Sequence, residues 1–107
     1  MKKYLVLLTL LFTLALNAGI VYVLNSGSET LSRLDLETGE LDNAFASLGL
    51  MPNRFVCSND FIYVVNSGDN SIQKIDAATG ETIINIFLET SSNPYDLVIW
   101  EDFLYVT

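Results

Sequence analysis

Few residues in this 107-residue chain could do chemistry, and their types exclude several kinds of site. The absence of His excludes His-ligated metals and the Ser-His-Asp and Cys-His forms of nucleophilic catalysis. A single cysteine, Cys57, excludes an internal disulfide framework and a zinc site built from several thiolates. Cys57 lies in an apolar run, where Cys packs as a small hydrophobic residue. We therefore predict that the chain is not an enzyme and holds neither a metal nor a cofactor.

The charged residues are mostly acidic, with 5 Lys and Arg against 13 Asp and Glu. No basic patch is present to neutralise phosphates, so nucleic acid is excluded as a partner. Asp35 and Asp76 each precede a Thr-Gly pair, a context that favours capping of a turn over acid–base chemistry. Asn66, Asp69 and Asn70 offer oxygen ligands of the kind that Ca²⁺ prefers, but their spacing does not match a calcium loop. We favour a turn there as well.

Residues 1–18 are typical of a secretory signal peptide. Two lysines precede an apolar run from Tyr4 to Leu16, and small residues follow at Ala18 and Gly19. An uncleaved anchor reaching Leu24 is the alternative, but the repeat described next requires residues 20–24 as a strand. We predict an N-terminal signal helix, contact with a membrane only through this peptide, and export to the periplasm, the cell surface or the medium.

A repeat occupies the remainder of the chain. The segment YVLNSG at residues 22–27 recurs as YVVNSG at residues 63–68, and YVT follows at residues 105–107. Thr-Gly pairs and single prolines recur in step with these segments. Polar turn residues and apolar positions therefore repeat together, which makes coincidence a poor explanation.

Each repeat unit has room for four short strands. In the complete unit they are expected at residues 53–57, 61–65, 71–75 and 82–87, each rich in β-branched or aromatic residues and bounded by turn residues. The second of these is apolar on both faces, which predicts a strand covered on both sides. Sheets of about 40 to 45 residues that cover one another are the blades of a β-propeller. We predict an all-β fold of antiparallel, four-stranded propeller blades.

The expected partial propeller spans residues 20–107. Blade one (20–46) lacks its first strand, blade two (53–87) is complete, and residues 95–107 begin blade three. Closed propellers have roughly 4 to 8 blades. We therefore expect a fragment of a longer protein, in which further blades or self-association bury the apolar blade faces.

The repeat resembles the YVTN-type β-propeller repeats of exported prokaryotic proteins. The matching residues are the segment 63–66, Gly68, a strand ending at Asp76, the pair Thr79-Gly80 and Pro94. Leu24 and Val65 stand where the family has Thr. Because a fold does not determine an activity, we predict a non-catalytic binding or surface scaffold module for an unknown ligand or protein partner. The resemblance also admits an alternative, a fragment of a propeller enzyme (a periplasmic dehydrogenase subunit or a lactonase-like enzyme) whose site lies in missing blades.

The candidate ligand contacts lie at the start of each unit's first strand, because the innermost strand of a propeller lines its channel. Arg54 and Asp96 occupy equivalent positions in successive units, so we expect them to be neighbours of opposite charge. Such a pair could orient a polar ligand, although a solvated ion pair worth about 0 to 1 kcal/mol is the simpler interpretation. The predicted channel-face residues are Arg54, Asn93, Tyr95 and Asp96.

Overall fold

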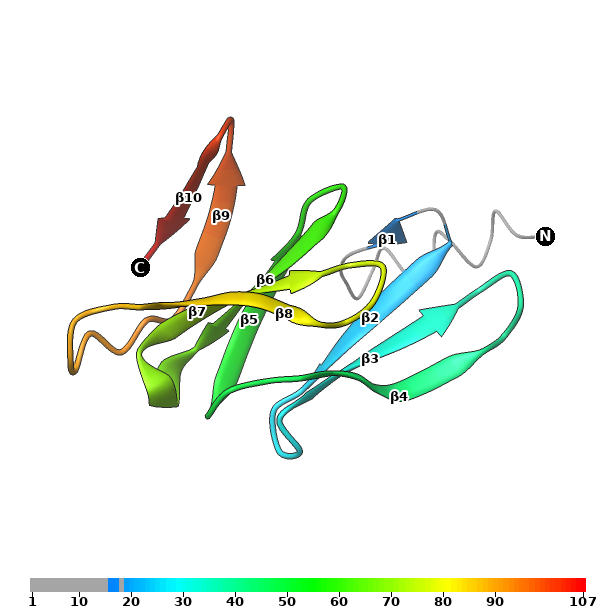
Figure 1. The fold of residues 1–107 in the computed structure, drawn as a ribbon, viewed down its shortest axis with the longest axis horizontal. Helices are drawn as coiled ribbons and strands as arrows, with labels where there is room; N and C mark the ends of the chain where they lie inside the picture. Colours follow the sequence, from blue (N-terminus) through cyan, green and yellow to red (C-terminus); the bar gives the residue numbers. More distant parts are fainter. Residues whose placement is uncertain (1–15, 18) are drawn as a thin grey trace.

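The computed structural model describes residues 16–17 and 19–107, and within them nearly all regular structure is β-strand (Figure 1). Two four-stranded antiparallel sheets are followed by a hairpin, and strand order in space follows strand order in sequence. Sheet one contains β1 (Leu16–Asn17), β2 (Ile20–Asn25), β3 (Thr30–Asp35) and β4 (Leu41–Ser47). Sheet two contains β5 (Pro52–Cys57), β6 (Phe61–Asn66), the short 3₁₀ turn η1 (Ser67–Asp69), β7 (Ser71–Asp76) and β8 (Thr82–Phe87). The hairpin contains β9 (Leu97–Trp100) and β10 (Phe103–Val106).

The all-β, antiparallel fold class predicted from the repeat is confirmed. In sheet two, β8 covers the predicted residues 82–87, while β6 and β7 each run one residue beyond their predicted ends. β5 begins at Pro52, one residue before the predicted start. Pro has no N–H to contribute to a strand ladder, so the first residue of a strand suits it.

The structure differs from the sequence prediction at two places. β9 begins at Leu97 rather than at residue 95. The amides of Tyr95 and Asp96 both donate to the carbonyl of Thr107, at 2.6 and 3.4 Å, an irregular pairing ahead of the strand. Leu16–Asn17 forms a two-residue strand that pairs with β2, where no first strand is predicted. These two residues belong to the predicted signal peptide, and the remainder of that segment lies outside the described residues.

Matching turns connect the third and fourth strands of both sheets. The carboxylates of Asp35 and Asp76 each accept hydrogen bonds from the backbone amides two and three residues further on, at 2.8–3.3 Å. Gly39 and Gly80 then take φ values of 78° and 80°, a region in which Gly has no steric penalty. The predicted turn-capping role of the two aspartates is confirmed.

Sheet one packs on one face of sheet two, and the β9–β10 hairpin lies near the other face (Figure 1). The Tyr22 hydroxyl crosses the first interface and donates to the carbonyl of Ala77 at 3.4 Å. The buried apolar residues of this interface are Tyr22, Leu31 and Ala46 from sheet one and Ile62, Val64 and Ile75 from sheet two. On the other face, Val65 and Ile72 pack with Leu97 of the hairpin. β6 is thus covered on both faces, as its unbroken apolar sequence predicts.

Several apolar side chains remain on the surface of the described residues. β8 is exposed along its whole length. Side chains alternate between the two faces of a strand, so every second residue of β9 and β10 points away from sheet two. These outward residues are also exposed. The large exposed apolar residues include Val23, Leu41, Ile84, Ile86, Phe87, Val98, Trp100, Phe103 and Tyr105.

Candidate functional site

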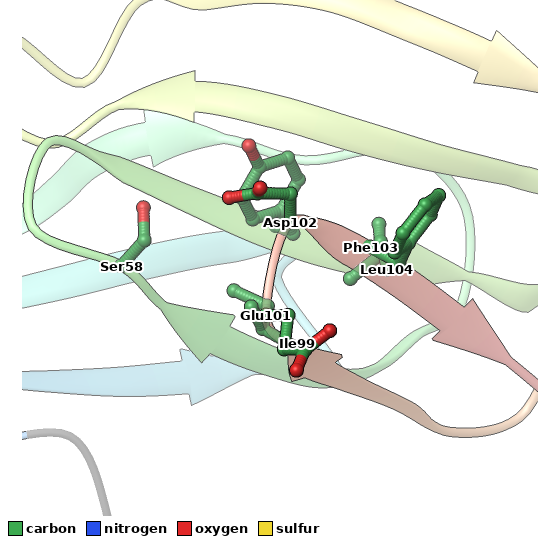
Figure 2. A pocket seen from close by; sticks show the side chains of 7 residues that line it. Ser58, Ile99, Glu101, Asp102, Phe103 and Leu104 are labelled. Carbon is green, nitrogen blue, oxygen red and sulfur yellow. The ribbon is translucent and has the colours of Figure 1, made fainter.

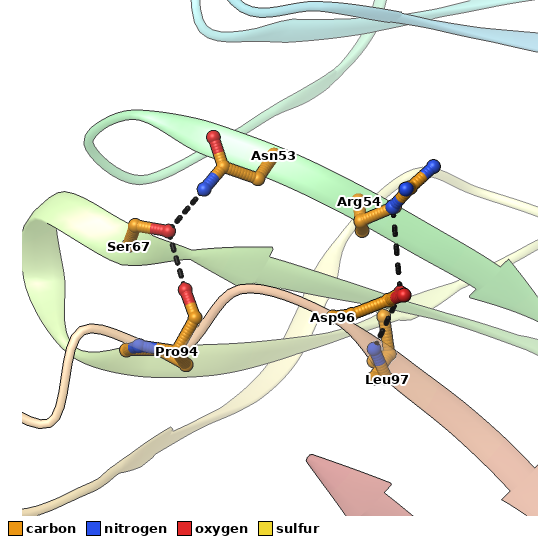
Figure 3. A network of polar contacts seen from close by, with 6 residues as sticks. All are labelled: Asn53, Arg54, Ser67, Pro94, Asp96 and Leu97. Carbon is orange, nitrogen blue, oxygen red and sulfur yellow. Dashed lines mark hydrogen bonds and ion pairs between the residues drawn. The ribbon is translucent and has the colours of Figure 1, made fainter. Parts of the chain in front are cut away.

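Arg54 and Asp96 lie side by side, as their equivalent repeat positions predict. The Arg54 Nε atom is 3.4 Å from a carboxylate oxygen of Asp96, and Figure 3 shows the pair joining β5 to the start of β9. The same carboxylate accepts a hydrogen bond from the Leu97 amide at 2.8 Å. Both charged side chains are about half exposed, so solvent screens their attraction and the pair adds at most about 1 kcal/mol of stability. The arrangement leaves a fixed positive and negative group at one surface.

The other two predicted site residues, Asn93 and Tyr95, precede Asp96 in the sequence but serve different purposes. Asn93 has a φ of 47°, and its amide donates to the side-chain oxygen of Asn70 at 2.9 Å. Asn93 therefore anchors the connecting loop to the turn after β6. Tyr95 is exposed, and only its backbone amide takes part in a described hydrogen bond. Tyr95 is adjacent to Asp96 in the sequence, and the residue is 63% exposed.

A repeated serine contact, which sequence reasoning missed, connects each unit to the next. The Ser26 hydroxyl donates to the carbonyl of Pro52 at 2.8 Å, and the Ser67 hydroxyl donates to the carbonyl of Pro94. Asn53 in turn donates its side-chain amide to the Ser67 hydroxyl (Figure 3). We call the two Ser–Pro hydrogen bonds the Ser–Pro clasps. Their sequence signal is a serine directly after the asparagine of each repeat.

Two of the residues considered above for calcium, Asp69 and Asn70, accept backbone hydrogen bonds with their side-chain oxygens. Asp69 accepts a hydrogen bond from the Leu50 amide at 2.8 Å, and the side-chain oxygen of Asn70 accepts from Asn93. Asn66 is buried and donates its amide to Gln73 at 3.0 Å. Within residues 16–17 and 19–107, no group of three or more Asp, Glu, Cys or His residues is arranged to hold a metal ion.

A pocket of about 250 Å³ lies between sheet two and the tip of the β9–β10 hairpin. Figure 2 shows Glu101 and Asp102 at the hairpin turn, with Ser58 on the other side of the pocket. Ser58 donates its hydroxyl to the Phe61 carbonyl at 3.3 Å, a contact within the turn between β5 and β6. This pocket offers apolar contacts and two carboxylates, from Glu101 and Asp102, that can accept hydrogen bonds. The lining residues are Ser58, Tyr63, Ile99, Glu101, Asp102, Phe103 and Leu104.

Cys57 packs against the core between the two sheets and is half-buried. Burial raises the pKa of its thiol from 9.0 to about 11, because the thiolate would lose hydration. A thiol with a raised pKa is a poor nucleophile at neutral pH. Burial likewise raises the pKa of the Tyr22 hydroxyl above its ordinary value. Both groups therefore act as packing residues.

No helix in the described part of the chain is both long enough and apolar enough to span a membrane. Comparison of the sequence with protein-family models matches none of them, and comparison with curated proteins finds no significant match.

Proposed function

We propose that this chain is an exported segment of a YVTN-type β-propeller that acts as a non-catalytic binding or surface scaffold module. In this proposal, sheet one, sheet two and the β9–β10 hairpin are successive blades. The observation that carries it is the pair of Ser–Pro clasps, in which the turn of one unit holds the loop that enters the next. In an array of repeated blades, each unit contacts its neighbour in the same way. The two clasps are such a contact, since one joins sheet one to sheet two and the other joins sheet two to the segment before β9.

The packing of the sheets supports the same arrangement. Tyr22 of sheet one faces sheet two, and Val64 of sheet two faces sheet one. Tyr63, the repeat equivalent of Tyr22, packs with the cluster that includes the hairpin residue Leu97. Each unit thus presents its tyrosine face to the unit that follows, which is the relation between neighbouring propeller blades.

The binding surface in this proposal is the face that carries Arg54, Tyr95 and Asp96. Strand starts and the turns after second strands meet at this face, and the ion pair there is accessible. Opposite charges held at an accessible surface can orient a polar group of a ligand or protein partner. The uncovered apolar faces of sheet one and the hairpin are where further blades or a second copy would pack.

Export is tested by expressing the full 107-residue chain in a Gram-negative host and measuring the intact mass of the product in each cell fraction. The proposal expects a product that begins at Gly19 outside the cytoplasm. A product that keeps residues 1–18 and stays in the membrane fraction contradicts the signal peptide.

The binding face is tested by placing a photo-crosslinking amino acid at Tyr95 in the exported protein. Thr38, an exposed turn residue at the opposite end of the strands, is the matched control position. The proposal expects discrete adducts from position 95, few from position 38, and loss of the adducts when Arg54→Glu and Asp96→Lys exchange the charges. Equal labelling from both positions contradicts a binding face.

A further inference from the structure

The outer edge of sheet two is formed by β8, which pairs with β7 alone among the described strands. β4 occupies the same place in sheet one, and its outer edge is likewise unpaired in the described residues. After β8 the chain continues through a loop into the β9–β10 hairpin (Figure 1). The free edge of β8 therefore belongs to a complete four-stranded sheet in the interior of the sequence. It presents backbone N–H and C=O groups that can hydrogen-bond to a further strand.

The two outer strands differ in charge. Charged side chains on an edge strand oppose its pairing with other chains. In β4, Asp42 lies opposite Arg33 of β3. At the equivalent place in sheet two, Ile84 lies opposite Lys74 of β7. The sequence of β8 is TIINIF, which contains no charged residue, Pro or Gly, so this edge lacks the protection that β4 has.

The side chains of β8 are accessible on both faces of the strand. Phe87 lies opposite Ser71, and Ser71 shares a face of β7 with Gln73. Gln73 donates to the carbonyl of Ser47, so this face is the one toward sheet one. Phe87 is nevertheless 71% exposed, although sheet one has all four of its strands on that side. Ile84, on the opposite face, is half exposed.

A carboxylate lies at each end of this apolar edge. Glu81 directly precedes β8 and Glu89 follows it closely, and both residues are exposed. A second copy paired antiparallel along β8 would set the Glu81 end of one copy beside the Glu89 end of the other, where like charges repel. The formal net charge of −8 adds to this repulsion. A strand with basic residues at its ends would instead meet a carboxylate at each end, so charge complementarity favours a basic partner over a second copy.

We propose that the outer edge of β8 is a docking site for a β-strand of a partner polypeptide, about as long as β8, rich in β-branched residues and flanked at both ends by Lys or Arg. Backbone hydrogen bonds along the edge supply the affinity, as in other cases of strand addition to a sheet. Glu81 and Glu89 select the partner by charge. This inference goes beyond the proposed function, because it uses neither export, nor the propeller arrangement, nor the Arg54–Asp96 face. It can therefore fail while those proposals stand.

The probe is the synthetic peptide KKVTVTVTKK, and its matched control EEVTVTVTEE keeps the strand and reverses the charges. Amide hydrogen exchange of the purified chain is measured with each peptide. We expect the lysine peptide at saturation to slow the outward-pointing amides of β8 roughly tenfold and to leave those of β4 unchanged. It should bind roughly fivefold more tightly than the glutamate peptide at low salt, and the difference should shrink as salt is added.

A third peptide, KKVTVPVTKK, tests the backbone pairing. Pro removes one N–H and cannot sit inside a paired strand, so this peptide should leave β8 exchange unchanged. Equal affinity of the lysine and glutamate peptides overturns the proposal, as does unaltered β8 exchange with the lysine peptide at millimolar concentration.

Exchanging the two end charges gives the sharpest test. The double variant Glu81→Lys with Glu89→Lys should prefer the glutamate peptide over the lysine peptide. The control Glu37→Lys with Glu40→Lys changes the net charge equally at exposed turn residues of sheet one and should keep the original preference. Reversal in both double variants overturns the proposal, because net charge alone would then explain it. So does slowing of β8 exchange with rising protein concentration and no peptide, since a second copy would then occupy the edge.

Discussion

Sheet one and sheet two have the same local architecture but different surroundings. Their third-to-fourth strand turns use the same aspartate, the same two amides and a glycine at nearly the same φ. Yet Val23 in sheet one is 50% exposed, whereas its repeat equivalent Val64 in sheet two is completely buried. The turn geometry of a repeat residue is therefore set within its own sheet, whereas its burial is set by the neighbouring sheet.

The largest difference is expected at the two turn glycines. A Cβ on Gly80 would collide with the backbone carbonyl of Phe45 in sheet one, whereas a Cβ on Gly39 meets nothing within 4 Å. Gly39→Ala should cost about 1 kcal/mol from its left-handed backbone alone. Gly80→Ala should cost about 2 to 4 kcal/mol, because overpacking is added to that strain. Urea unfolding of both variants measures the difference, and equal losses would show that the sheets do not meet at this turn.

The matched valines should differ next most. Val64→Ala removes two methyl groups from a fully buried site and should cost about 2 to 3 kcal/mol. Val23→Ala makes the same chemical change at a half-exposed site and should cost less than about 1 kcal/mol. The free energies of unfolding of the two variants give the comparison directly. A similar loss at both positions would indicate that something covers Val23 in solution.

The turn aspartates should behave alike, which tests the shared part of the architecture. Asp35→Ala and Asp76→Ala each remove two hydrogen bonds to backbone amides in exposed turns, and each should cost about 1 kcal/mol. Asp→Asn at either position keeps an oxygen acceptor and should restore most of the loss. Thermal unfolding of the four variants measures both effects. A twofold or greater disparity between the two Asp→Ala variants would argue against equivalent turns.

The smallest effect at neutral pH is expected from the half-buried thiol of Cys57. The Cys57 pKa is raised from 9.0 to about 11 in the fold, so folded and unfolded chains both keep the proton below pH 9. Between pH 9 and 11 the unfolded chain loses this proton first, and the free energy of unfolding therefore falls as pH rises.

Cys57→Ala should remove this part of the pH dependence while leaving the rest. The difference between the two pH profiles, measured by urea unfolding, isolates the thiol. Alkylation of Cys57 by iodoacetamide at pH 8 should also be slower in the folded chain than in urea. Equal rates would contradict a buried thiol.

Much of the fold could be predicted from the sequence, because the same turn-forming residues recur at the same positions of each repeat unit. Asp76, Thr79 and Gly80 identify a hairpin, and the β-branched run after them identifies β8 with its observed ends. The proximity of Arg54 and Asp96 also followed from their equivalent repeat positions. The Ser67 contact with Pro94 did not, since a serine in a turn has many partners within reach and only the placed chain selects one.

The sequence alone determined the four strands of sheet two, the turns between them and the residues that cap those turns, because these interactions join residues only a few positions apart. It did not predict β1, whose two residues belong to the predicted signal peptide. The tertiary structure decided which equivalent residues are buried and which carbonyl each serine hydroxyl contacts. Burial and the serine contacts both depend on segments that are far apart in the sequence and meet only in the folded chain. The same valine side chain is therefore interior in sheet two and surface in sheet one.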